Sequence, residues 1–86
     1  MKDGLIVYLV GGAELPEDFN PTPAARALGV AADRVEMVAP EQGFFTVEDA
    51  WHFLFTRGCG RISLMVAEAT GATSLRALGP AVRLYG

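Results

Sequence analysis

The sequence predicts a small α/β domain with a four-stranded, mainly parallel sheet and helices on both faces. Three observations lead to this prediction. The chain has 86 residues, which is enough for a single domain over residues 1–86 and no more. Hydrophobic residues make up 51% of the chain, a content that excludes a disordered protein. Short apolar runs alternate along the chain with segments of helical pattern, as in right-handed β-α-β units.

Four segments have the composition of strands. Residues 5–10 and 62–67 are apolar on both faces, so we expect them to be central strands that are covered on both sides. Residues 34–39 and 82–85 mix apolar with polar side chains, as edge strands do. Numbered along the chain, the strands therefore take the order 2-1-3-4, a truncated flavodoxin-like arrangement. A ferredoxin-like α+β sandwich with an antiparallel sheet is the alternative.

Three helical segments connect the strands. The first covers residues 23–28 and starts with a proline, the residue that is favoured at the first helical position. The second covers residues 46–57 and opens with a near capping box, in which an aspartate replaces the usual glutamate or glutamine. A third, short helix leads from residues 70–74 to Gly79. We expect the first helix on one face of the sheet and the other two on the opposite face.

Composition and charge exclude several classes of protein. The formal net charge of −3 argues against nucleic-acid binding, which needs a basic surface. The longest apolar run, residues 5–10, is far shorter than the ~20 residues that span a bilayer, and the amino terminus lacks the apolar core of a signal peptide. We therefore expect a cytoplasmic protein that does not contact a membrane. A single cysteine, Cys59, allows neither an intrachain disulfide nor a cysteine-rich zinc site, and we expect no cofactor or metal.

The charges divide unevenly along the chain. Residues 1–50 carry nine acids against three bases, whereas residues 51–86 carry four arginines against Glu68 alone. One interpretation is that acids and bases of the two halves meet across a single folded surface. The other is a modest anion-attracting patch on the carboxyl-terminal half.

The carboxyl-end edge of the sheet is the candidate binding site. In parallel folds, ligands bind where the strand order reverses, which here lies between the first and third strands. The loops after these strands consist of small residues that let a ligand approach the backbone, and a following helix N-terminus would offer unpaired N–H groups to a small anion. The same residues serve equally well as ordinary turns and helix caps. The candidate ligand-binding residues are Gly11, Gly12, Thr70, Gly71, Thr73 and Ser74.

Catalytic groups are not indicated. His52 and Cys59 occur once each, but helical spacing places His52 on the polar face and Cys59 in a turn about 10 Å further along the axis. We therefore expect an exposed histidine and an inert turn cysteine. Three acids, Glu14, Glu41 and Glu68, fall near the carboxyl-end edge, where acids are commonly solvated, and their spacing matches no metal-binding loop. We assign no catalytic residue.

One local segment resembles helix-turn-helix DNA-binding domains. Residues 24–30 read A-A-R-A-L-G-V and residues 33–35 read D-R-V, which is similar to the helix and turn before a recognition helix. The segment that would contact DNA holds Asp33 and Glu36 against one arginine, a charge that phosphates repel, and Pro40 ends it early. The same residues also fit the helix-to-strand joint of a β-α-β unit.

Unequal cover of the sheet predicts self-association. The second helix has an apolar arc wider than packing on a sheet requires, so Phe53 and Phe55 at its edges are candidates for contact with another subunit. The opposite face has only the short alanine-rich helix that ends at Leu28, the third candidate interface residue, and this leaves apolar surface for a second copy. A rival interpretation is that Leu15 and Phe19, in the loop after the first strand, fold over that face as a lid.

These observations favour a small, self-associating binding or accessory module, most simply a two-fold dimer, with a small anion as the candidate ligand at the carboxyl-end edge. The first alternative is a small enzyme or carrier that acts at the same edge. The second alternative is a helix-turn-helix DNA-binding protein.

Overall fold

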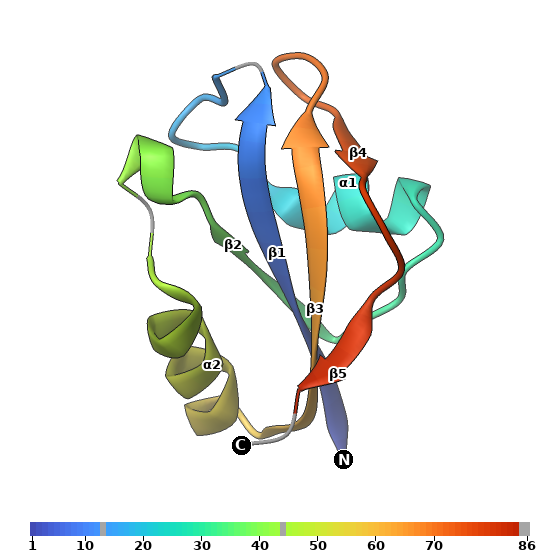
Figure 1. Ribbon diagram of the computed structural model, residues 1–86. Helices are drawn as coiled ribbons and strands as arrows, with labels where there is room; N and C mark the ends of the chain where they lie inside the picture. The colour runs from blue at the N-terminus through green and yellow to red at the C-terminus, as the bar shows by residue number, and fades with distance from the viewer. Residues whose placement is uncertain (13, 44, 85–86) are drawn as a thin grey trace.

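A sheet of five strands and two α-helices form a mixed α/β fold (Figure 1). The computed structural model describes residues 1–12, 14–43 and 45–84. Its strands are β1 (Lys2–Gly12), β2 (Arg34–Val38), β3 (Cys59–Ala69), β4 (Leu75–Ala77) and β5 (Val82–Leu84). Its helices are α1 (Pro21–Ala27), α2 (Val47–Thr56) and the short 3-10 helix η1 (Pro40–Gln42). β2 and β3 flank β1 and run parallel to it, whereas β4 and β5 both pair antiparallel with the outer edge of β3.

The predicted mixed α/β class is confirmed, and β1 and β3 are the central strands. The predicted order 2-1-3-4 corresponds only roughly to the sheet, because there are five strands and two of them are antiparallel to β3. The ferredoxin-like alternative does not fit, since β1 is parallel to both of its neighbours. β5 takes the place of the predicted fourth strand, and Tyr85 of that prediction lies outside the described residues.

The predicted third helix is wrong, because residues 75–77 form β4. Leu75 is buried in the core, and Arg76 forms an ion pair with Glu68 on the neighbouring strand. The segment between residues 70–74 and Gly79 is too short to form a helix on its own, because a helix needs several turns to offset the free-energy cost of nucleation. Pairing with β3 therefore determines its conformation.

α1 and the loop before it cover one face of the sheet. The helix begins two residues earlier than predicted, because the side-chain oxygen of Asn20 accepts the Thr22 N–H at 3.1 Å and caps the helix. Ala25 is fully buried. Leu15 is 5% exposed, and Phe19 packs against the same core. The expectation that this face is open is therefore wrong, and the rival interpretation of a lid is confirmed.

α2 covers part of the opposite face and has the predicted boundaries. Thr46 is the N-cap, and both hydrogen bonds of the capping box with Asp49 are present. The helix ends at Thr56 with Arg57 as its C-cap, and Gly58 follows with a φ of +88°, a left-handed conformation that favours glycine. The buried core on this side consists of Ile6, Val38, Ala50, Leu54, Cys59 and Ile62.

The contact between α2 and the sheet depends on two small residues. Cys59 is the first residue of β3 and is 1% exposed, so the prediction of a turn cysteine is wrong. A Cβ atom on Gly4 would lie 3.1 Å from Leu54 Cδ1 and 3.2 Å from Cys59 Cβ. Glycine at this position in β1 therefore lets α2 approach the sheet closely.

Candidate functional site

The two loops of the predicted ligand edge lie side by side. Gly12 pairs with Ala69, so the loop after β3 runs beside the end of β1. That loop is tight, because the Thr70 N–H donates to the Ser74 carbonyl at 3.1 Å and the two hydroxyl oxygens are 2.8 Å apart. Gly11 has a φ of +49°, in the region that glycine adopts most readily.

The contacts at this edge do not single out an anion. In the described part of the chain the loop of residues 70–74 leads into β4, so the helix N-terminus expected there does not form. A Cβ atom on Gly71 would lie 3.4 Å from Ser74 Oγ, an ordinary contact distance. Over residues 1–12, 14–43 and 45–84, no group of three or more His, Cys, Asp or Glu residues is placed to hold a metal ion. Ligand binding at this edge stays a prediction.

His52 and Cys59 are not arranged as a catalytic pair. The His52 side chain is 64% exposed, with Nε2 3.8 Å from Glu48 Oε1, whereas Cys59 lies in the core beneath α2. Burial raises the pKa of the Cys59 thiol, and the negative charge of Asp33 raises that pKa further. A nucleophilic cysteine needs the opposite shift, because the thiolate is the reactive form.

The three candidate interface residues do not form one surface. Phe53 is half-buried between two guanidinium groups, with Arg34 Cζ 4.9 Å and Arg57 Cζ 4.2 Å from its ring centroid. Phe55 is 58% exposed and stacks on the tryptophan one turn earlier, with ring centroids 5.1 Å apart. Leu28 packs against the core beneath α1, on the other side of the sheet.

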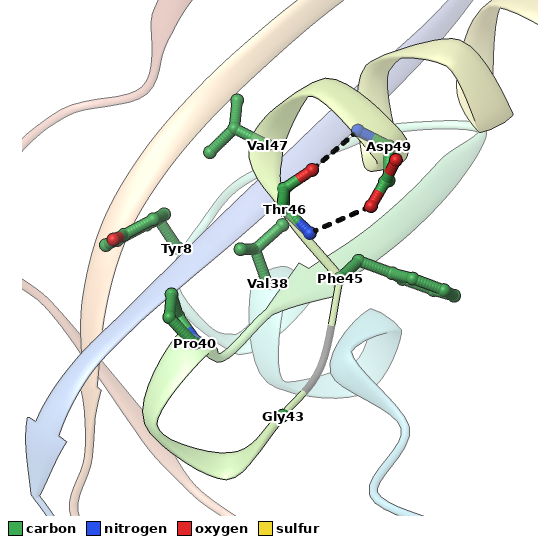
Figure 2. Close-up of a pocket in the computed structure, with 8 residues that line it drawn as sticks. All are labelled: Tyr8, Val38, Pro40, Gly43, Phe45, Thr46, Val47 and Asp49. Carbon is green, nitrogen blue, oxygen red and sulfur yellow. Dashed lines mark hydrogen bonds between the residues drawn. The ribbon is translucent and has the colours of Figure 1, made fainter.

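A cavity that the sequence reasoning missed lies at the N-terminus of α2 (Figure 2). Its volume is about 620 Å³, and its walls are mainly apolar. The polar groups at its rim bond to each other: Thr46 Oγ1 accepts the Asp49 N–H at 3.1 Å, and Asp49 Oδ2 accepts the Thr46 N–H at 3.4 Å. The sequence signal is the connection at residues 40–43, which begins with proline and ends with glycine. The apolar walls come from Tyr8, Val38, Pro40, Phe45 and Val47.

An exposed apolar surface of the sheet lies on the α2 side, over β3, β4 and β5. In Figure 1, α1 lies behind the sheet and α2 lies near β2, and no other described helix covers these strands. Val82 is 59% exposed, Leu78 48% and Val66 36%. Tyr8 and Leu64 lie half-buried beside them. We call Tyr8, Leu64, Val66, Leu78 and Val82 the open face.

Phe55 borders the open face. Phe53 contacts Arg34 of β2, so that flank of α2 points towards β2. Two residues further on, at about 100° per residue, Phe55 lies about 200° round the helix axis from Phe53, on the flank that faces away from β2. Its stacking partner Trp51 packs against the same core as Leu84 of β5. The stack of Trp51 and Phe55 therefore extends the apolar surface beyond the sheet.

Two further findings bear on the other candidate functions. Residues 34–38 form β2, whereas the resemblance to helix-turn-helix domains requires a recognition helix after the turn. No helix in the described part of the chain is long and apolar enough to cross a membrane.

Comparison of the chain with known protein families, with curated proteins and with solved structures finds no match.

Proposed function

We propose that the protein is a self-associating module in which a second copy covers the open face. The observation that supports this proposal is the unequal cover of the sheet. Leu15 and Phe19 complete the α1 side, whereas Val66, Leu78 and Val82 stay exposed together on the α2 side. Contiguous apolar patches of this kind are uncommon on monomeric proteins and mark contact surfaces.

A second copy is the simplest partner for this surface. Two identical apolar patches complement each other about a two-fold axis, which is the commonest symmetry of protein oligomers. A standard interface covers about 800 Å² on each partner. The chain has a surface of 5115 Å², so such an interface needs about a sixth of it, or most of one side of the sheet. The open face and the stack of Trp51 and Phe55 form the apolar part of such a side.

Association also compensates for the small size of the domain. A chain of 86 residues buries only about 63% of the surface that its unfolded form exposes, so its stability as a monomer is small. Binding a second copy stabilises the folded state by mass action. A small anion at residues 70–74 is not part of this proposal, because no specific contact there favours it.

Sedimentation equilibrium of Val82→Asp tests the proposal. A two-fold contact places two copies of the new carboxylate in the apolar interface, so the dissociation constant is expected to rise by about a hundredfold or more. The matched control is Ala27→Asp, which adds the same charge to an exposed position on α1, across the sheet from the open face. We expect the mass of Val82→Asp to fall below that of wild type at micromolar concentration, while Ala27→Asp keeps the wild-type mass. A wild-type protein that sediments at 9.1 kDa, or a Val82→Asp protein with the wild-type mass, would contradict the proposal.

A further inference from the structure

In the part of the chain that the structure describes, no strand neighbours the outer edge of β2. β2 is the last strand on its side, and an edge strand presents N–H and C=O groups that can pair with another strand. Many proteins protect such edges with proline, bulges or charged side chains, lysine above all. β2 contains no proline and no lysine, and its pairing with β1 runs over all five residues without a register shift. Its outer edge is therefore free to accept a strand of regular geometry.

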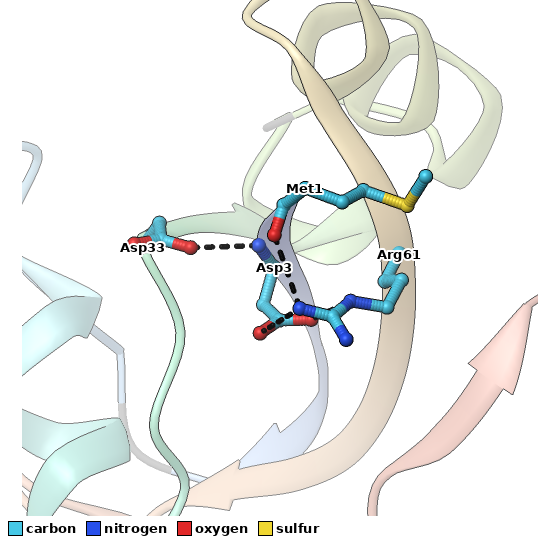
Figure 3. Close-up of polar contacts among 4 residues, drawn as sticks. All are labelled: Met1, Asp3, Asp33 and Arg61. Carbon is cyan, nitrogen blue, oxygen red and sulfur yellow. Dashed lines mark hydrogen bonds and ion pairs between the residues drawn. The ribbon is translucent and has the colours of Figure 1, made fainter.

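The contacts of Asp3 in β1 (Figure 3) indicate which N–H and C=O groups of β2 point away from β1. Asp3 directs both of its backbone groups at the segment that leads into β2: its N–H donates to Asp33 Oδ2 at 2.7 Å, and its carbonyl accepts the Asp33 N–H at 2.8 Å. Arg61 holds this end of β1 in place, because its Nε lies 2.8 Å from Asp3 Oδ1. Successive residues of a strand alternate the direction of these groups. Leu5 therefore also bonds towards β2, and its register partner Val35 directs N–H and C=O away from β1.

A cavity lies beside β2. Its volume is about 370 Å³, and its lining combines the β2 residues Val35, Glu36 and Met37 with residues that include Phe19 and Phe45. Phe45 is 53% exposed and bounds the cavity near the carboxyl end of β2. The cavity offers apolar contacts to the side chains of an added strand.

The charged side chains of β2 indicate which strand can pair with its outer edge. Arg34 and Glu36 lie on either side of Val35, and their Nε and Oε1 atoms are 2.8 Å apart. The Glu36 side chain is 15% exposed, so a second arginine would bind a carboxylate that is already largely removed from water. We propose that β2 pairs antiparallel with β2 of a second copy, about a two-fold axis at Val35.

This register places opposite charges against each other twice. Arg34 lies opposite Glu36 of the second copy on both sides of the axis, and the outward backbone groups of the two Val35 residues meet as a hydrogen-bonded pair. Moving the axis by one residue in either direction places two Glu36 or two Arg34 side chains opposite each other, which is unfavourable. Two antiparallel copies of β2 are therefore complementary in charge, whereas an unrelated peptide would have to supply the same order of charges.

The contact goes beyond the proposed function, because it uses the opposite edge of the sheet from the open face. Each contact alone gives a dimer. Both together give a closed tetramer if the two axes meet at a right angle and an open chain if the axes do not meet.

Charge exchange tests the pairing, and each variant is made in the Val82→Asp background so that the open face does not contribute. Arg34→Glu and Glu36→Arg each place like charges opposite each other in a homodimer, so the dissociation constant of each is expected to rise at least about tenfold. The double variant Arg34→Glu/Glu36→Arg restores opposite charges and is expected to dimerise like its parent. An equimolar mixture of the two single variants, one labelled with ¹⁵N, is expected to form a 1:1 heterodimer in native mass spectrometry.

The heterodimer separates pairing across the axis from loss of the ion pair within each chain, because both single variants lose that ion pair. Arg34→Gln and Glu36→Gln form a neutral series that perturbs the fold least, and we expect a rise in dissociation constant of about threefold for each. Single variants that dimerise like their parent, or a mixture without heterodimer, would overturn the pairing. A Val82→Asp protein that stays a dimer and responds to the charge exchange supports the pairing even if the mass of Val82→Asp equals that of wild type, a result that contradicts the open-face contact alone.

Discussion

Replacing Cys59 with serine tests whether the first residue of β3 belongs to the core. Its side chain is 1% exposed, and the buried residues that surround it, such as Leu54 and Ile62, are apolar. Serine keeps nearly the same volume but places a hydroxyl among these side chains. A buried hydroxyl without a hydrogen-bond partner costs about 1–3 kcal/mol, so the free energy of unfolding is expected to fall by about 2 kcal/mol.

The assay is urea unfolding followed by the fluorescence of Trp51, at one protein concentration for all variants because association changes the apparent stability. Cys59→Ala is the matched control, since it removes the sulfur atom but buries no polar group, and its expected cost is about 1 kcal/mol. Serine resembles cysteine more closely than alanine does, yet Cys59→Ser is expected to lose more free energy of unfolding than Cys59→Ala. A serine variant within about 0.5 kcal/mol of wild type, the range of ordinary surface substitutions, would refute the burial of Cys59.

Three further predictions concern the same region. Gly4→Ala is expected to lower the free energy of unfolding by about 1–2 kcal/mol because its Cβ meets the core beneath α2, whereas in Gly60→Ala the new Cβ meets only the flexible Met1 side chain and the loss is smaller; thermal unfolding compares them. Thr46→Ala removes the N-cap acceptor and should cost about 1 kcal/mol, and a loss no larger than that of Thr56→Ala, at an exposed hydroxyl, would contradict the cap. Since the folded state raises the pKa of the Cys59 thiol, its contribution to stability is present below about pH 9 and is lost as pH rises through the folded-state pKa, so wild type should lose stability above pH 9 more steeply than Cys59→Ala; parallel pH profiles would exclude this.

Local signals predicted the parts of the fold that depend on local chemistry. The capping box at Thr46 and the glycine at position 58 mark both ends of α2. The apolar faces of β1 and β3 indicate their central places in the sheet. The expectation that β3 is covered on both sides is wrong, because Val66 on its α2 side is 36% exposed. The start of α1 was misplaced because Asn20 and Thr22 are both good N-caps, and the proline at position 21 fits the first turn as well as the one at position 23.

Pairing between strands decided what the composition of a single segment could not. Residues 75–77 have helix formers on either side of Arg76, yet their contacts with β3, 6 to 10 residues earlier in the chain, make them a strand. Because the predicted third helix does not form, part of the α2 side of the sheet is exposed, whereas Leu15 and Phe19 cover the α1 side. The two faces of the sheet are therefore unequally covered, but the face left open is the opposite one from that expected. The pairing capacity of the β2 edge was not visible in the sequence, because it depends on which backbone groups face outward.

The most direct test of self-association through the open face is an isotope-filtered NOE experiment on a mixture of ¹³C-labelled and unlabelled protein. Intermolecular NOEs report proton pairs within a few ångströms that belong to different chains. The proposed contact predicts such NOEs between the methyl groups of Val66, Leu78 and Val82 in one chain and these residues or the Tyr8 ring in the other. Intermolecular NOEs that are absent at concentrations where the protein sediments as an oligomer, or that arise only from residues outside the open face, would contradict it.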